Sequence, residues 1–86
     1  SKAEARRYGQ LRLLEKANEI SDLRLQYPFE CKINEKKICT YRADFDYFEG
    51  DQWVVEDVKG FRTQVYRLKK RLVEALYGVE IREVKA

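Results

Sequence analysis

The chain has 86 residues and a formal net charge of +3, with 18 Lys or Arg against 15 Asp or Glu. Its 44% of hydrophobic and 38% of charged residues are typical of one small globular domain and argue against a disordered segment. The chain has no His, which excludes Ser-His-Asp and Cys-His catalysis and HExxH zinc sites. Its longest apolar runs are two or three residues, so we expect no membrane-spanning segment.

The first half of the chain is predicted to contain one helix and one strand. Residues 1–20 fit a helix that opens with a capping box and continues with an i, i+3 apolar stripe. Residues 23–33 alternate between apolar and polar side chains, which predicts a half-buried strand with Pro28 at an edge or a bulge. A polar turn over residues 34–37 follows.

The second half is predicted to contain a β-hairpin, a helix and a final strand. Residues 41–48 and 53–58 form the hairpin around a tight turn at Gly50-Asp51. Thr63 can cap a helix over residues 64–77 that ends at Gly78 and buries one face made of Val65, Leu68, Leu72 and Leu76.

Residues 79–84 suggest a last strand in which Ile81 points inward. The predicted order is therefore α-β-β-β-α-β, an α/β fold. The helix between the third and fourth strands allows a parallel crossover, so we expect a mixed sheet with flanking helices.

The hairpin is predicted to bring two carboxylates together. With the turn at Gly50-Asp51, Asp44 lies opposite Asp57 and Arg42 lies opposite Lys59. Opposed like charges are destabilising in a sheet, so the pair indicates a bound cation. The alternatives to a metal site are a solvated sheet face or an ion pair between Lys59 and Asp57.

Asp46 lies on the same face as Asp44, and it is either a decoy, a carboxylate that only resembles a metal ligand, or an extra ligand. Glu56 points the other way, as a surface or interface residue.

Glu4 is the third acidic candidate, and two roles compete for it. At about 100° per residue it lies on the same helix face as Tyr8 and Leu11, so it would look toward the sheet. It can equally close the capping box with Ser1, which is a sufficient structural role.

Five cations and no anion occupy residues 62–71, and these are candidates for binding a polyanion: Arg62, Arg67, Lys69, Lys70 and Arg71. The alternative is a solvated helix face. Lys69 lies only about 40° from Val65 on the predicted buried face, so it can reach the sheet instead.

Asp44, followed by Asp57-Val58-Lys59 after a hairpin turn and preceded by a helical Glu, resembles the PD-(D/E)xK nucleases, the restriction-endonuclease-like superfamily. Four blocks resemble more narrowly a small phage-associated family of domains of unknown function, usually described as candidate phage endonucleases. These blocks are Lys2–Tyr8, Tyr41–Phe45, Val54–Gly60 and Thr63–Lys70. Ala43 departs from the pattern, because the superfamily often has Pro there.

The resemblance implies a metal-dependent endonuclease that hydrolyses phosphodiester bonds in DNA. Asp44, Asp57, the Val58 carbonyl and Glu4 would hold Mg²⁺, with Mn²⁺ as a substitute. Lys59 would position the attacking water or stabilise the charge that develops on the phosphate. The basic residues of 62–71 would hold the backbone of duplex or branched DNA.

The resemblance further implies a phage- or prophage-encoded protein in the bacterial cytoplasm. Residues 1–86 would be a single nuclease-like domain that lacks a native N-terminal segment. Two symmetric cuts would need a homodimer. The alternative functions are an inactive nucleic-acid-binding module with a nuclease fold and a structural or interaction domain of a mobile element.

Overall fold

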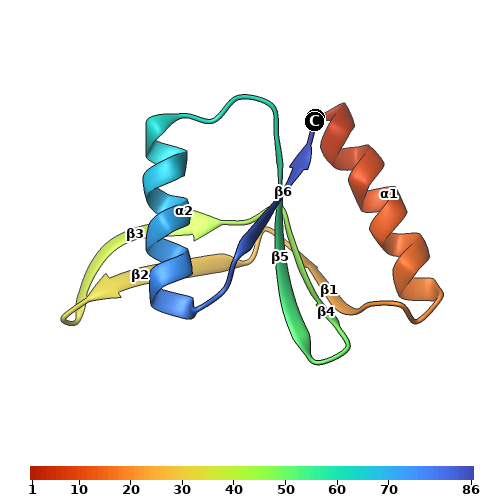
Figure 1. Ribbon diagram of the computed structural model, residues 1–86, viewed down its shortest axis with the longest axis horizontal. Helices are drawn as coiled ribbons and strands as arrows, with labels where there is room; N and C mark the ends of the chain where they lie inside the picture. Colours follow the sequence, from red (N-terminus) through yellow and green to blue (C-terminus); the bar gives the residue numbers. More distant parts are fainter.

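A computed structural model describes residues 1–86 as two helices and six strands (Figure 1). The elements are α1 (Lys2–Lys16), β1 (Ser21–Leu25), β2 (Pro28–Ile33), β3 (Lys36–Arg42), β4 (Phe45–Glu49), β5 (Gln52–Lys59), α2 (Gln64–Tyr77) and β6 (Ile81–Lys85). Neither helix is long and apolar enough to cross a membrane.

Four strands form a mixed sheet in the order β1-β4-β5-β6, and β2 and β3 pair with each other in a separate two-stranded sheet. β4 is antiparallel to both β1 and β5, whereas β6 runs parallel to β5 after the α2 crossover. The expected mixed α/β class is therefore confirmed. Figure 1 shows the β2–β3 hairpin extending away from the main sheet beneath α2.

Two predicted strands are each broken in two, which gives six strands where four were expected. The strand predicted over 23–33 breaks at Gln26, which has a positive φ of 55°. The strand predicted over 41–48 breaks at Ala43 and Asp44, between β3 and β4. If each broken strand is counted as one bent unit, the order is the predicted α-β-β-β-α-β. Both breaks let the chain leave the main sheet and form the β2–β3 hairpin.

The register of the hairpin from β4 to β5 is the predicted one, because Phe45 pairs with Glu56 and Glu49 pairs with Gln52. Gly50 has φ +63°, the left-handed conformation that this tight turn requires. The prediction for Arg42 is wrong. It lies opposite Pro28 on β2, because the break before β4 carries β3 into the other sheet.

The two helices begin where their caps predict. Ser1 caps α1, and Thr63 caps α2, which ends at the left-handed Gly78. α1 stops at Lys16, four residues earlier than predicted, and Asn18 follows it with φ +61°.

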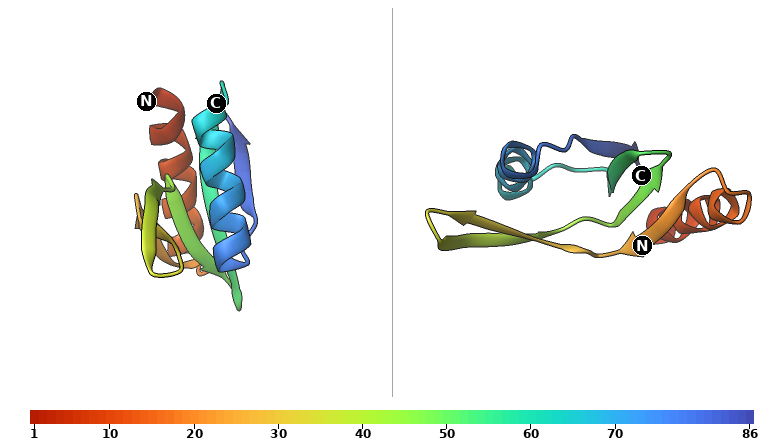
Figure 2. Two further views of the ribbon diagram at one scale, coloured as in Figure 1. Left: turned by 90° about the vertical axis from the view of Figure 1, so that its left-hand side faces the viewer. Right: turned by 90° about the horizontal axis from the view of Figure 1, so that it is seen from below.

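The main sheet has a small apolar cluster on each side, and the helices cover these clusters (Figure 2). On the α1 side lie Leu11, Ile20, Phe45, Tyr47 and Val54. On the α2 side, extending over the β2–β3 hairpin, lie Phe29, Cys31, Tyr41, Ala43, Val55, Tyr66, Val73 and Ile81.

The predicted buried face of α2 is wrong for Val65, Leu68 and Leu76, which are exposed, whereas Leu72 packs against the core as expected. Val65 is 63% exposed and Leu68 is 65% exposed, whereas Tyr66 and Val73 are the buried residues of the helix. The apolar arc of α2 is wider than the part that the sheets cover. The sheets pack against the side of α2 that carries Tyr66. The hydroxyl of Tyr66 donates to Glu83 on β6.

Candidate metal centre

Asp44 and Asp57 lie side by side, held by two reciprocal hydrogen bonds. The N–H of Asp44 donates to Oδ1 of Asp57 at 2.9 Å, and the N–H of Val58 donates to Oδ2 of Asp44 at 2.8 Å. Asp57 comes from within β5, whereas Asp44 lies in the break before β4. The structure therefore brings together the two carboxylates that the hairpin register predicted to be opposed. At Val58 the structure shows a hydrogen bond from the N–H to Asp44, and the predicted binding of metal by the Val58 carbonyl stays a prediction.

Asp57 carries a buried oxygen without a partner. The residue is 2% exposed, and its Oδ2 has no hydrogen-bond donor. Burial is the main cause that raises the pKa of Asp57 from 3.8 to about 6, and the nearby carboxylates of Glu4 and Glu83 add to it. The hydrogen bond from Asp44 and the charge of Lys59 act in the opposite direction. A buried polar atom without a partner is costly, so this oxygen is a candidate ligand atom.

Asp44 and Glu4 line the same pocket, and the second oxygen of Asp44 has one hydrogen bond. This oxygen, Oδ1, accepts a long hydrogen bond of 3.3 Å from the amide of Gln26. The pocket lies between the first turn of α1 and the strand break, with Tyr8 and Phe45 among its apolar walls. Asp44 and Glu4 thus approach one opening from two different elements.

Only the backbone of Glu4 takes part in the helix cap. The hydroxyl of Ser1 accepts from the Glu4 N–H at 3.2 Å, which forms half of the predicted capping box. The Glu4 carboxylate is part of none of the ion pairs in the chain. It is half-buried and free to face the pocket.

An ion pair that sequence reasoning missed anchors α1 to the sheet. Arg7 donates from Nε to one oxygen of Glu56 at 2.9 Å and from Nη2 to the other at 2.7 Å. Tyr47 also donates its hydroxyl to this carboxylate. Glu56 is fully buried, so its prediction as a surface or interface residue is wrong. The signal for it was present, because Glu56 lies between valines on one strand face and a buried charge needs a partner.

Lys59 does not form the predicted alternative ion pair with Asp57. Its Nζ lies 4.2 Å from the centre of the Tyr66 ring, as a cation–π contact. Tyr66 in turn donates to Glu83 at 2.7 Å, and Glu83 lies opposite Asp57 in the parallel ladder. Tyr66 and Glu83 therefore fix the surroundings of Lys59, and both were missed in the sequence.

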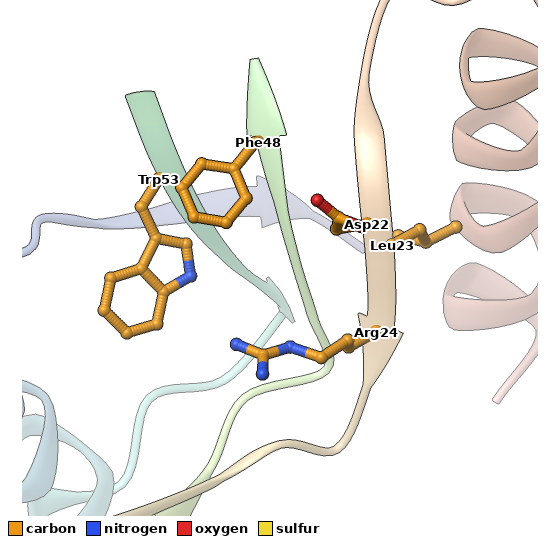
Figure 3. A pocket seen from close by; sticks show the side chains of 5 residues that line it. All are labelled: Asp22, Leu23, Arg24, Phe48 and Trp53. Carbon is orange, nitrogen blue, oxygen red and sulfur yellow. The ribbon is translucent and has the colours of Figure 1, made fainter. Parts of the chain in front are cut away.

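Both oxygens of Asp46 accept hydrogen bonds, so of its two predicted roles the decoy agrees with the structure and the extra ligand does not. Arg24 donates from Nε to Oδ2 of Asp46 at 3.0 Å, and the indole N–H of Trp53 donates to the same oxygen at 2.9 Å. Figure 3 shows the Arg24 and Trp53 side chains turned toward each other, with Phe48 beside the indole ring. The pocket drawn there opens where a bulge in β1 shifts its pairing with β4.

The five predicted nucleic-acid-binding residues have different surroundings. Arg62 pairs with Glu83 at 2.8 Å, and Lys70 pairs with Glu74 at 3.5 Å. Lys69 donates to the Thr40 carbonyl at 3.3 Å, so it reaches the sheet as the helix angles allowed. The other two, Arg67 and Arg71, are exposed on α2.

No group of three or more Asp, Glu or Cys side chains is arranged as a complete metal cage. The pair of Asp44 and Asp57 instead fits a hard cation of the Mg²⁺ type, which commonly takes one or two carboxylates and keeps several waters. The buried Oδ2 of Asp57 is the atom that carries this fit, because a cation would satisfy it.

Neither a curated protein nor a solved structure shows significant similarity to the chain. Residues 1–85 match a family described as protein of unknown function, DUF1064. Because the match spans nearly the whole chain, the protein belongs to the DUF1064 family.

Proposed function

We propose that this domain is a Mg²⁺-dependent endonuclease that hydrolyses phosphodiester bonds in DNA, built on a PD-(D/E)xK arrangement. The observation that carries the proposal is the buried, partnerless Oδ2 of Asp57 beside the carboxylate of Asp44. A purely structural carboxylate at this depth would be expected to have a donor for each oxygen, as Asp46 and Glu56 have.

The carboxylates differ in how firmly they are held. Two backbone N–H groups each hold one oxygen of Asp44 and of Asp57, so the other oxygen of each carboxylate keeps one orientation. Glu4 approaches from α1, which the Arg7–Glu56 pair anchors one turn further along the helix. When bound at this position, Mg²⁺ would neutralise charge on the scissile phosphate and acidify a water.

Lys59 is the residue that we assign to the reacting phosphate. It lies on the same face of β5 as Asp57, and two residues along a strand correspond to about 7 Å. The ring of Tyr66 supports the ammonium and leaves its donors free of any ion pair. In this position the ammonium can orient the attacking water or stabilise negative charge that develops on the phosphate oxygens.

DNA is the substrate that best fits the charges outside the site. Arg67 and Arg71 project from α2 into solvent, and α2 directly follows β5 in the chain. Exposed guanidinium groups suit backbone phosphates, and such contacts position nucleic acid without reading its sequence.

The test is cleavage of a panel of labelled DNAs, comprising duplex, flap and four-way junction, with Mg²⁺ or with EDTA. We expect Mg²⁺-dependent products from the wild type, and none from Asp57→Ala or Lys59→Ala. Asp51→Ala, an exposed turn residue, is the matched control and should cleave like the wild type. Salt-sensitive DNA binding without cleavage of any substrate would refute the enzyme and favour the inactive binding module.

A further inference from the structure

The two cysteines of the chain lie directly opposite each other on the β2–β3 hairpin. Cys31 of β2 pairs with Cys39 of β3 in the antiparallel register, and both are free thiols. Cys31 belongs to the apolar cluster on the α2 side, and Cys39 packs against the same cluster, so both side chains lie on one face of the hairpin. Figure 1 shows this hairpin beneath α2.

A register shift of one residue creates this opposition. Nearer the turn, Lys32 pairs with Lys37. An unbroken ladder would therefore place Ile38 opposite Cys31. The register instead shifts between Lys32 and Cys31, so Cys39 takes that position. Because side chains alternate between the two faces of a strand, an unshifted register would have sent the two thiols to opposite faces.

The spacing of the two strands fits a disulfide bond. Directly opposed residues of an antiparallel pair have Cα atoms about 4.5 to 5.5 Å apart, and disulfides span about 4.4 to 6.8 Å between Cα atoms. The two thiols are also near enough to affect each other. Burial raises the pKa of Cys31 to about 11, and the neighbouring Cys39 adds to this rise. The strands therefore do not need to move for the two sulfur atoms to be joined.

The two thiols differ in their access to solvent. Cys31 is fully buried, and its thiol donates to the Phe29 carbonyl at 3.9 Å. Cys39 is only half-buried, so a small molecule in solution can reach it. This difference sets the order of a reaction at the pair, because the reachable thiol must react first and the covered thiol second.

We infer that Cys31 and Cys39 are a modification site, at which a small-molecule disulfide such as oxidised glutathione produces a reversible disulfide within the chain. Cys39 loses its proton, and its sulfur attacks one sulfur of the small disulfide, so that a mixed disulfide forms and one glutathione thiolate leaves. Cys31 then loses its proton and attacks the Sγ of Cys39, and the second glutathione thiolate leaves. The two departing thiolates take up the two protons. Two protein thiols are thus oxidised, and one small disulfide is reduced to two thiols.

The disulfide would fix the surface on which α2 rests. This helix contacts the residue next to each cysteine, because Lys69 donates to the Thr40 carbonyl at 3.3 Å and Tyr77 donates to the Glu30 carbonyl at 2.8 Å. Joining the strands restricts the unfolded chain and leaves the folded hairpin in its present register, so the oxidised form should be the more stable one. The inference does not depend on the proposed nuclease activity.

The test exposes the native 86-residue protein to oxidised glutathione, blocks the remaining thiols with N-ethylmaleimide in denaturant, and measures the intact mass. We expect a monomer with no blocked thiol and no bound glutathione, and dithiothreitol should restore both thiols. The thermal midpoint of the oxidised form should lie roughly 10 °C above that of the reduced form. Cys31→Ser should stop at the mixed disulfide and carry one glutathione.

A double variant, Cys39→Ser with Thr40→Cys, is the matched control. It keeps two cysteines at nearly the same spacing along the chain, but Thr40 lies on the other face of the hairpin, where its hydroxyl donates to Glu30. In the native state it should close the internal disulfide at least about 10-fold more slowly than the wild type, whereas the two should react equally fast in urea.

Three results for the wild type would overturn the inference: it keeps both thiols, it stops at the mixed disulfide, or it loses stability on oxidation. A native double variant that closes its disulfide as fast as the wild type would also overturn it. In that case closeness along the chain, and not the register of β2 and β3, would explain the reaction.

Discussion

Replacing Asp57 with Asn removes the charge of the candidate metal ligand while keeping the shape of its side chain. A pKa of about 6, against 3.8 without the fold, means that ionised Asp57 costs the folded state about 3 kcal/mol. The Asn amide would leave an N–H₂ without an acceptor at the position of Oδ2, which costs about 2 kcal/mol. The net gain for the variant without metal is about 1 kcal/mol at about pH 8, or roughly 5 °C in the thermal midpoint.

The sign of this effect should reverse in acid. Between pH 3.8 and about 6, folded Asp57 holds a proton that the unfolded chain has released. The stability contributed by this group therefore falls as the pH rises through that window and is level above about pH 7. At about pH 4 the wild type has lost most of its penalty, whereas the variant keeps its unpaired amide, so Asn becomes the less stable form.

The measurement is thermal unfolding in EDTA at about pH 4, 6 and 8, repeated at about pH 8 with Mg²⁺. We expect Mg²⁺ to raise the midpoint of the wild type and leave Asp57→Asn unchanged, because a ligand stabilises only a form that binds it. Asp51→Asn should follow the wild type under every condition. An Asp57→Asn variant that is less stable than the wild type at both extremes of pH would refute the reasoning about the buried carboxylate.

Three further predictions concern the supports of the site. Arg7→Ala should lower the free energy of unfolding by about 3 kcal/mol, because it leaves a buried carboxylate unpaired, whereas Arg6→Ala should change chemical denaturation little. Glu4→Gln should leave that free energy almost unchanged but cut cleavage about 10- to 100-fold, and near wild-type cleavage would return Glu4 to its helix cap. Arg71→Gln should weaken DNA binding and lower its salt slope by about one, whereas Lys69→Gln should leave the slope unchanged in fluorescence anisotropy.

Local chemistry in the sequence was enough to predict the hairpin and the bounds of α2. A glycine at the turn and strict period-two alternation fix which residues oppose each other, so the register of β4 and β5 was predictable. The Thr63 cap and the terminal Gly78 made the first and last residues of α2 predictable. The closeness of Asp44 and Asp57 follows from that register, and this part of the candidate site could be derived from the sequence.

The rest depended on contacts between residues that are distant in the chain. Glu56 is buried because Arg7, 49 residues away, supplies its charge partner. Glu83 stands beside the site only through the parallel register of β6, and no local signal encodes a register set across a helix. The wide apolar arc of α2 allowed two buried faces, and the tertiary structure chose the one that carries Tyr66. Periodicity shows that a helix has an apolar side, but only its neighbours decide how much of that side they cover.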